Sequence, residues 1–261
     1  MNEEYWRRLL DQGSKFYREN IEVIKDILLQ NRGYITEIPR DECVILLLSG
    51  GMDSTMLIDI VIRKWNCRVI LLYFRRISKN QQWEEKAVDY FIEFYKKRYP
   101  ENVIEAIKLE IEIPSRINKE YLDRTRQKIL GLPLRNTVMW GNAFAQAVYL
   151  SGKYQKTIRT VIVGSVEEDI TSPESGILSI LSQNLHTCVA MGVWYYQLLA
   201  PFLDGSLGRI YNKLDLLKYA KKHDIPIEKS RSCFGAEEEP CNECLACKNR
   251  INAFNQLEEN S

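Results

Sequence analysis

The sequence predicts an α/β protein with a Rossmann-like, doubly wound parallel sheet, and three observations indicate this class. Apolar runs at 43–48 and 69–74 have the length of strands, and a helix-length segment separates them, as in a β-α-β unit. Shorter apolar and amphipathic segments continue this alternation as far as residue 163. The chain has 261 residues, of which 45% are hydrophobic, so it can build one large α/β domain or two small ones.

Residues 1–38 predict two helices that precede the sheet. Apolar positions recur at helical spacing in each, and Gly13 and Ser14 separate the two patterns. These positions are Tyr5, Leu9 and Leu10 in the first helix and Ile21, Ile24, Ile27 and Leu28 in the second. Such spacing is typical of a helix face that packs on a core, so we expect a packed extension in preference to a free partner surface.

The remaining elements follow in chain order from the same two patterns. We expect strands at 44–48, 69–74, 103–113 and 160–163, and helices at 54–65, 83–99 and 138–150.

The charge balance argues against nucleic acid as the main ligand. The chain has 36 Lys and Arg residues, 35 Asp and Glu residues and a formal net charge of +1, so no overall basic field would attract a polyanion. We therefore expect a small-molecule substrate. No apolar run approaches the roughly 20 residues of a membrane helix. The first residues lack the basic and apolar regions of a secretion signal, so we expect a cytoplasmic protein without membrane contact.

The segment Ser49-Gly50-Gly51-Met52-Asp53-Ser54 is the most informative part of the sequence. It follows a buried strand and precedes a helix, and its two glycines allow positive φ and a close approach of ligand to backbone. The helix that begins at Ser54 and Thr55 offers free N–H groups and a dipole that favour phosphate. Ser49, and Gly164 after a later strand, lie at carboxyl ends of strands, where such sheets bind ligands.

Asp53 indicates a metal ion or a cationic neighbour in this phosphate site. A carboxylate beside phosphate is unfavourable unless a divalent cation or a nearby donor offsets its charge, so we expect a nucleotide with Mg²⁺. No Gly-Lys-[Ser/Thr] follows, so this is not a Walker loop. The alternative is an ordinary turn between strand and helix, which has no need of paired glycines, flanking serines and an acid together.

A cysteine cluster near the C-terminus predicts a metal site. Its members are Cys233, Cys241, Cys244 and Cys247, spaced Cys-x7-Cys-x2-Cys-x2-Cys. Four thiolates at these separations can surround one tetrahedral ion, and zinc is the first choice. An iron–sulfur cluster is the alternative, and four free thiols in a polar, acidic segment would be open to oxidation. Because a closed set of four thiolates leaves no position for substrate, we expect a structural metal. Cys43, Cys67 and Cys188 lie among apolar residues and are expected to be core thiols.

Together these motifs resemble the QueC family, the 7-cyano-7-deazaguanine synthases, a branch of the ATP pyrophosphatases or PP-loop enzymes. The resemblance runs in order from Val44 to about Phe254. The matching segments are Ser-Gly-Gly-Met-Asp-Ser at 49–54, Leu-Pro-Leu-Arg-Asn-Thr at 132–137, Gly164 to Asp169, Asn212-Lys213, Ser-Cys-Phe-Gly at 232–235, the other three cysteines and Arg250.

The resemblance implies an adenine nucleotide alpha hydrolase-like fold and a division of the chain into three parts. We expect an N-terminal helical extension at 1–38, a PP-loop ATP pyrophosphatase domain at 39–230, and a zinc-binding segment at 231–261 that packs on the same domain. A homodimer is also implied.

The implied activity is the adenylation of 7-carboxy-7-deazaguanine with ATP and Mg²⁺, after which ammonia gives an amide and then a nitrile. The residues implied for catalysis are Asp53, Ser54, Arg135 and Lys213. Those implied for nucleotide binding are Ser49, Gly50, Gly51, Asp53, Ser54, Thr55, Asn136 and Gly164.

The physical chemistry of three of these positions agrees with that role and leaves a simpler alternative open. Arg135 and Asn136 end a loop and open a helix, so they offer a cation and an amide to the α-phosphate; otherwise they are a surface arginine and a helix cap. Lys213 offers a charge that neutralises phosphate; otherwise it is an ordinary solvated lysine.

The segment Thr171-Ser172-Pro173-Glu174-Ser175-Gly176 departs from the family pattern Tyr-Pro-Asp-Cys-Arg. The Asp becomes Glu174 and the Arg becomes Gly176, so a bidentate donor near the substrate is lost. We therefore expect a changed substrate or acceptor, as in QueC-like paralogues of antiviral operons, including type IV CBASS, where the acceptor would be an amine of a partner protein. Glu168, Asp169 and Glu174 are the expected substrate-binding residues and could accept the amine proton; the alternative is a solvated acidic loop.

Three hypotheses on function follow. The preferred one is a ligase that adenylates a 7-deazaguanine carboxylate and transfers it to a nitrogen nucleophile, either a protein amine or, as in a standard synthase of the queuosine pathway, ammonia. The second is a PP-loop enzyme that modifies tRNA, against which the balanced charge argues. The third is a binding subunit that keeps nucleotide and zinc for structure alone.

Overall fold

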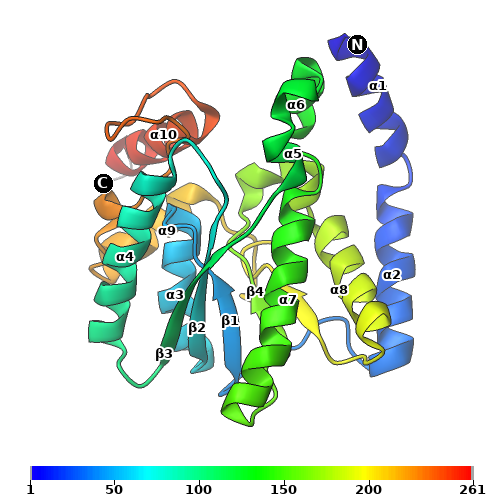
Figure 1. The fold of residues 1–261 in the computed structure, drawn as a ribbon, viewed down its shortest axis with the longest axis vertical. Coiled ribbons are helices and arrows are strands. Elements are labelled where there is room, and N and C mark those ends of the chain that lie inside the picture. The colour runs from blue at the N-terminus through cyan, green and yellow to red at the C-terminus, as the bar shows by residue number, and fades with distance from the viewer. Residues whose placement is uncertain (1, 260–261) are drawn as a thin grey trace.

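The structure, a computed structural model, describes residues 2–259, and its centre is a parallel sheet with the strand order β3-β2-β1-β4-β5 (Figure 1). The strands are β1 (Cys43–Leu47), β2 (Arg68–Arg75), β3 (Val103–Glu110), β4 (Thr160–Ile162) and β5 (Gln197–Leu199). The chain winds outward from β1 to β3, then crosses back past β1 to β4 and β5. This order confirms the predicted doubly wound sheet and places the reversal of direction between β1 and β4, where such sheets bind ligands.

Helices cover both faces of the sheet because successive residues of each buried strand point to opposite sides. In β1, Val44 and Leu46 pack against one layer, and Cys43 and Ile45 pack against the other. The first layer contains α3 (Met52–Trp65), α4 (Gln81–Arg98), α9 (Lys213–Lys222) and α10 (Leu245–Glu259). The second layer contains α7 (Arg135–Tyr154) and α8 (Ile177–Met191).

Some element boundaries differ from the sequence-based expectation. Helices α3 and α7 begin earlier than expected, at Met52 and Arg135. Strand β3 ends at Glu110, before the expected end at residue 113. Ile111 and Ile113 continue the apolar alternation past the strand and are buried in the same cluster as residues of α7, which is why the sequence pattern overestimates its length. The chain then forms α5 (Pro114–Ile117), a 3₁₀ turn (Lys119–Tyr121) and α6 (Arg124–Leu130). Among the helices of residues 2–259, none is long and apolar enough to span a bilayer.

The N-terminal extension forms α1 (Glu3–Ser14) and α2 (Tyr17–Arg32), which run beside α6 and α8 (Figure 1). Ile21 and Leu28 of α2 share a small buried cluster with Leu181 of α8. Trp6 of α1 donates its indole N–H to Asp123 Oδ1 at 3.0 Å, at the start of α6. Both helices are therefore packed on the rest of the protein, and Met1 lies outside the described residues.

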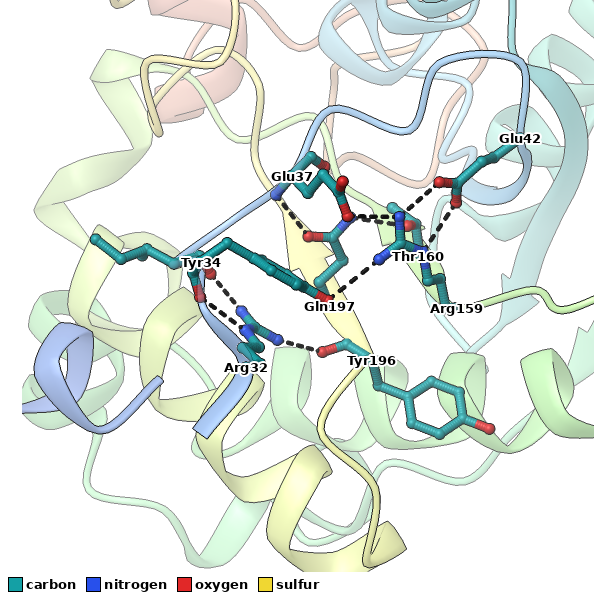
Figure 2. Close-up of polar contacts among 9 residues, drawn as sticks. Arg32, Tyr34, Glu37, Glu42, Arg159, Thr160, Tyr196 and Gln197 are labelled. Atoms are coloured by element: carbon teal, nitrogen blue, oxygen red, sulfur yellow. Dashed lines mark hydrogen bonds and ion pairs between the residues drawn. The ribbon is translucent and has the colours of Figure 1, made fainter. Parts of the chain in front are cut away.

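The segment that links α2 to β1 is fixed to the amino ends of β4 and β5 (Figure 2). Glu37 N–H donates to Gln197 Oε1 at 2.9 Å, and Gln197 Nε2 donates back to Glu37 O at 2.8 Å. Arg159 Nη2 lies 2.7 Å from Glu37 Oε2 and 2.5 Å from Glu42 Oε1. Hydrogen bonds to Glu42 and Glu37 raise the pKa of Arg159. This network holds the end of the sheet opposite to the glycine loop.

Candidate active site

The glycine loop turns at the carboxyl end of β1 and leads into α3. Gly50 has φ +72°, and a Cβ at this position would lie 2.8 Å from Glu84 O, so only glycine fits without a shift of backbone. Gly51 is the N-cap residue of α3, and no side chain caps the first N–H groups of the helix. The loop therefore has the geometry of a phosphate site, as its sequence predicts.

Two serines of this loop form hydrogen bonds with each other. Ser54 Oγ lies 3.0 Å from Ser49 Oγ and accepts the Ser49 N–H at 3.1 Å. Thr55 is fully buried, and its hydroxyl finds no hydrogen-bond partner among the described residues. The Thr55 side chain is thus part of the packing below the loop, while Ser49 and Ser54 fix the loop's shape.

Gly164 brings the loop after β4 against the glycine loop. A Cβ on Gly164 would lie 2.8 Å from Ser54 N and 3.0 Å from Ser54 Cα. Only glycine permits this approach, so the carboxyl ends of β1 and β4 form one continuous surface.

Asp53 and Lys213 form a partly buried ion pair at this surface. Lys213 Nζ lies 2.8 Å from Asp53 Oδ2 and 3.0 Å from Oδ1. Burial raises the pKa of Asp53, against the opposing effect of Lys213. Burial alone would lower the pKa of Lys213, but the attraction of Asp53, Asp169 and Glu168 together outweighs this and raises the pKa. The sequence required a cation or a donor beside Asp53, and in this structure Lys213 supplies the donor.

Helix α9 aims Lys213 at Asp53 through its first turn. The Asn212 side chain accepts the Asp215 N–H at 3.0 Å, and the Asp215 carboxylate accepts the Asn212 N–H at 3.2 Å, which makes a capping box. Lys213 N–H donates to Glu168 Oε1 at 2.9 Å. The loop that carries Glu168 is thereby tied to the start of α9.

The start of α7 forms the second side of the site. Glu174 Oε2 accepts the Asn136 N–H at 3.4 Å, and Arg135 Nε lies 3.4 Å from Asn136 Oδ1. Burial raises the pKa of Glu174, and burial followed by the charge of Arg76 lowers the pKa of Arg135. Asp169 Oδ2 accepts the Val166 N–H at 3.2 Å and so holds its own turn together.

The structure thus brings the expected residues into two adjoining groups. The first contains Ser49, Gly50, Gly51, Asp53, Ser54, Gly164, Glu168 and Lys213. The second contains Arg135, Asn136 and Glu174. Asp169 contributes its charge to both, since it acts on the pKa values of Asp53, Lys213 and Arg135.

The four clustered cysteines converge on one point. Their sulfurs all lie within 4.8 Å of one another, and Cys233 Sγ and Cys241 Sγ are 3.5 Å apart. A tetrahedral zinc ion needs sulfurs roughly 3.8 Å apart, as follows from Zn–S bonds of about 2.3 Å. Cys233 Sγ also accepts the N–H groups of Gly235 at 3.2 Å and Cys241 at 3.3 Å. The donor set therefore fits a closed metal site, and Cys43, Cys67 and Cys188 are buried elsewhere.

The cysteine segment also supports the glycine loop. Arg231 N–H donates to Gly50 O at 2.8 Å. The Asn80 side chain donates to Cys233 O at 3.1 Å and to Glu84 Oε1 at 3.0 Å. The cysteine segment thus contacts the glycine loop through its backbone. Asn80, Glu84 and Arg231 were not among the predicted site residues, although the polar run after β2 includes Asn80.

Gly176 contacts the N-terminal extension. A Cβ on Gly176 would lie 3.1 Å from the Tyr17 hydroxyl, and this hydroxyl accepts the Leu178 N–H at 3.3 Å. Tyr17 of α2 thus occupies the space where a larger residue 176 would place its side chain. The side chains of Ile170 and of Thr171, the first residue of the altered segment, lie outside the described part of the structure.

A sequence model of the family described as "Queuosine biosynthesis protein QueC" matches residues 43–258. The match begins at β1 and ends in α10, so it leaves out α1 and α2. A 7-cyano-7-deazaguanine synthase of Campylobacter concisus (strain 13826) is 26% identical over 226 residues, which cover 80% of this chain and 92% of that protein. A 7-cyano-7-deazaguanine synthase of Aquifex aeolicus (strain VF5) is 28% identical over 227 residues, which cover 81% of this chain and 95% of that protein.

Two solved structures show weaker likeness. The U34-tRNA thiolase NcsA from Methanococcus maripaludis with its 4Fe-4S cluster is 14% identical and covers 94% of this chain and 74% of its own, with a TM-score of 0.43. The NMN synthetase from Francisella tularensis is 15% identical and covers 93% of this chain and 94% of its own, with a TM-score of 0.39.

Proposed function

Because the chain belongs to the QueC family, we propose that it uses ATP to adenylate the carboxylate of 7-carboxy-7-deazaguanine and transfers the acyl group to a nitrogen nucleophile. The observation that supports this most is the placement of a buried cation, Lys213, beside the glycine loop that begins α3. N–H groups without a side-chain cap at the start of α3, and the ammonium group of Lys213 beside them, suit a phosphate chain that gains charge as it leaves.

The first step joins a carboxylate oxygen of the substrate to the α-phosphorus of ATP and breaks the bond to pyrophosphate. The N–H groups of the loop hold phosphate oxygens, and Lys213 and Arg135 offset the charge on the leaving group. Mg²⁺ would bind at Asp53 and supply further charge to the phosphates. Zinc at the four cysteines would hold the loop in place through Arg231 and has no part in the reaction.

The second step joins the nitrogen to the acyl carbon, breaks the bond from that carbon to the AMP oxygen, and moves a nitrogen proton to a base. Glu174 suits this task because burial raises its pKa toward neutrality. Its Oε1 is buried and forms no hydrogen bond with the described residues. Glu168 and Asp169, by contrast, accept backbone N–H groups and serve to position the loop.

Ammonia is the acceptor that we propose first, because the named relatives are 7-cyano-7-deazaguanine synthases. These two steps give an amide. The amide oxygen would then attack the α-phosphorus of a second ATP with loss of pyrophosphate, and departure of AMP and of both N–H protons would leave the nitrile precursor of queuosine, made in the cytoplasm by a homodimer.

A protein amine, as in an antiviral paralogue, is the second candidate. The observation that favours it is the altered segment at 174–176, where Tyr17 lies against Gly176 in place of an arginine side chain.

The mass of the product tests the proposal and separates the two acceptors. Purified protein is incubated with ATP, Mg²⁺ and 7-carboxy-7-deazaguanine, with and without ammonia, and with a candidate partner protein. We expect AMP, pyrophosphate and the nitrile when ammonia is present. A partner that gains the acyl mass at an amine, with poor nitrile formation, would favour the second candidate. Absence of deazaguanine-dependent AMP in every arm would contradict both.

A further inference from the structure

Tyr17, the first residue of α2, extends from the N-terminal extension to the altered segment at 171–176. Its hydroxyl accepts the Leu178 N–H at 3.3 Å, and a Cβ on Gly176 would lie 3.1 Å from the same oxygen. Its ring packs against the small apolar cluster between α2 and α8. The ring therefore joins two helices, and the hydroxyl contacts the residues that begin α8.

The hydroxyl of Tyr17 replaces a cap that α8 lacks. Gly176 is the N-cap residue of this helix and has no side chain that could accept a hydrogen bond. Leu178 is the second residue of the helix, and its N–H is one of those that a serine or threonine cap would accept. Because Tyr17 supplies the acceptor from another helix, the start of α8 depends on α2.

The start of α8 in turn affects where Glu174 lies. Glu174 belongs to the 3₁₀ turn Pro173–Ser175, which directly precedes Gly176. The contacts of this turn with α7 are long, since the hydrogen bonds from Asn136 to Glu174 Oε2 and to Ser175 Oγ both measure 3.4 Å. Typical N–H···O distances are about 2.7 to 3.2 Å, and a short 3₁₀ turn has poor internal hydrogen bonds. The contacts with α7 alone therefore fix the turn weakly.

Helix α2 is also attached at its far end, so Tyr17 has a fixed support (Figure 2). Arg32, the last residue of α2, donates from Nη1 to Tyr196 O at 2.8 Å. The hydroxyl of Tyr34, just after the helix, accepts from Arg159 Nη1 at 3.1 Å. These bonds join the extension to the amino ends of β4 and β5, at the opposite end of the sheet from the glycine loop.

We propose that Tyr17 is a positioning residue for the second step, because its hydroxyl holds the turn of Glu174 where this carboxylate can accept a proton from the incoming nitrogen. This inference rests on the proposed function and adds the N-terminal extension to the site. The match to the family model begins at residue 43, so Tyr17 lies outside the matched part of the chain.

Tyr17→Phe tests the proposal because the two steps can be measured separately. Adenylation is followed as the exchange of labelled pyrophosphate into ATP, with 7-carboxy-7-deazaguanine present and no nitrogen nucleophile. We expect this exchange to stay within about twofold of the wild type, since Glu174 acts in the second step. Formation of the amide with ammonia, in a single turnover, should slow by about tenfold or more, because a small displacement of a reacting group has a large effect on rate.

Tyr34→Phe is the matched control because it removes a hydroxyl from the same extension at the other end of the sheet. Each variant loses one hydrogen bond, so both melting temperatures should fall by about 2 to 4 °C. Amide formation should be slow in Tyr17→Phe alone. Equal rates of amide formation in the two variants would assign Tyr17 to packing and overturn the proposal.

Gly176→Ala tests the same hydroxyl from the other side. Gly176 has φ −80°, which alanine adopts without strain, but the new Cβ would push the Tyr17 hydroxyl away. We expect amide formation to slow as in Tyr17→Phe, and the double variant to be no slower than either single variant. Rate losses that multiply in the double variant would contradict a shared cause.

Hydrogen exchange of the Leu178 amide, measured by NMR, checks the contact without the reaction. It should be faster in Tyr17→Phe than in the wild type, and an unchanged rate would overturn the proposal. Loss of pyrophosphate exchange in Tyr17→Phe would also overturn it, because Tyr17 would then act on adenylation. Failure of the proposed function has another signature, since the wild-type protein itself would show no deazaguanine-dependent exchange, and this inference would fall with it.

Discussion

At the scale of single residues, we expect the ion pair of Asp53 and Lys213 to contribute to both stability and activity. Lys213 Nζ lies 2.8 Å from Asp53 Oδ2, and the two side chains are 10% and 21% exposed. Removal of one partner leaves the other charge poorly solvated, which costs more than the intact pair contributes. We expect Lys213→Met to lower the free energy of unfolding by about 2 kcal/mol. Adding Asp53→Asn should restore most of this loss, as measured by urea denaturation.

Activity should not recover with stability in that double variant. Both side chains belong to the proposed phosphate site, so pyrophosphate release should be lost in each single variant and in the double variant. Lys218→Met, on the exposed side of α9, is the matched control and should change neither quantity. Stability losses that simply add in the double variant would show that the two charges do not interact.

Local patterns predicted part of the site, and long-range contacts supplied the rest. The positive φ of Gly50 and the open start of α3 follow from the glycine loop itself. The contact of Arg76 with Met139 and that of Tyr17 with Gly176 join residues far apart in the chain. No single-sequence pattern encodes such contacts, because they depend on how separate helices pack.

At the scale of elements, Glu85 of α4 joins β2 and β3 through one residue of each strand. It accepts from Arg75 Nε at 3.1 Å and from Lys108 Nζ at 2.8 Å. Hydrogen bonds from Arg75 and then Lys108 lower the pKa of Glu85 from 4.5 to about 2. A carboxyl with a lowered folded-state pKa stabilises the protein above its unfolded-state pKa, and this stabilisation is lost as the pH falls through that range.

Glu85→Gln should therefore be less stable than the wild type by about 1 to 2 kcal/mol at pH 6.5. The difference should shrink as the pH is lowered from 4.5 toward 2, the span between the two pKa values. Chemical denaturation at several pH values measures this difference in the free energy of unfolding. Glu93→Gln, at an exposed position of the same helix, should show little change at any pH. A Glu85→Gln difference that is constant with pH would contradict the ion-pair explanation.

The elements that the sequence predicted well are those with a long, regular pattern of buried apolar residues. Strands β1 and β2 and helix α4 agree closely because each carries a continuous apolar run or a complete amphipathic face. Strand β5 has only three residues, and β3 ends where its apolar alternation continues into a loop. Strand β5 was not among the expected strands, and packing against neighbouring helices decides where β3 ends, so periodicity alone was insufficient. The divisions at 38 and 230 stay predictions.

At the scale of the whole molecule, the cysteine cluster connects folding to the nucleotide site. Because Arg231 N–H donates to Gly50 O and Asn80 donates to Cys233 O, loss of the metal should loosen the glycine loop. We expect about one zinc per chain by elemental analysis. Chelation, or Cys244→Ser, should lower the melting temperature and weaken ATP binding, and zinc added back to the chelated protein should restore both.

Two results would refute the zinc assignment. One is a coloured protein with iron and acid-labile sulfide in place of zinc, which would indicate an iron–sulfur cluster. The other is a metal-free protein with the same melting temperature before and after chelation.

The central claim for the molecule is that the substrate carboxylate is joined to AMP before nitrogen attacks. Transfer of oxygen tests this directly, because nitrogen attack breaks the bond between the acyl carbon and the oxygen that it shares with AMP. That oxygen comes from the substrate, so it must leave with the nucleotide. Other routes of activation, such as transfer of the terminal phosphate, would not place it there.

The measurement is mass spectrometry of AMP formed from ATP and 7-carboxy-7-deazaguanine labelled with ¹⁸O in both carboxylate oxygens, with ammonia as acceptor. Adenylation in the site formed by the glycine loop, Lys213 and Arg135 predicts AMP that carries one ¹⁸O atom in its phosphate, together with unlabelled pyrophosphate. Unlabelled AMP alongside product, or ¹⁸O in inorganic phosphate with ADP formed instead, would contradict it.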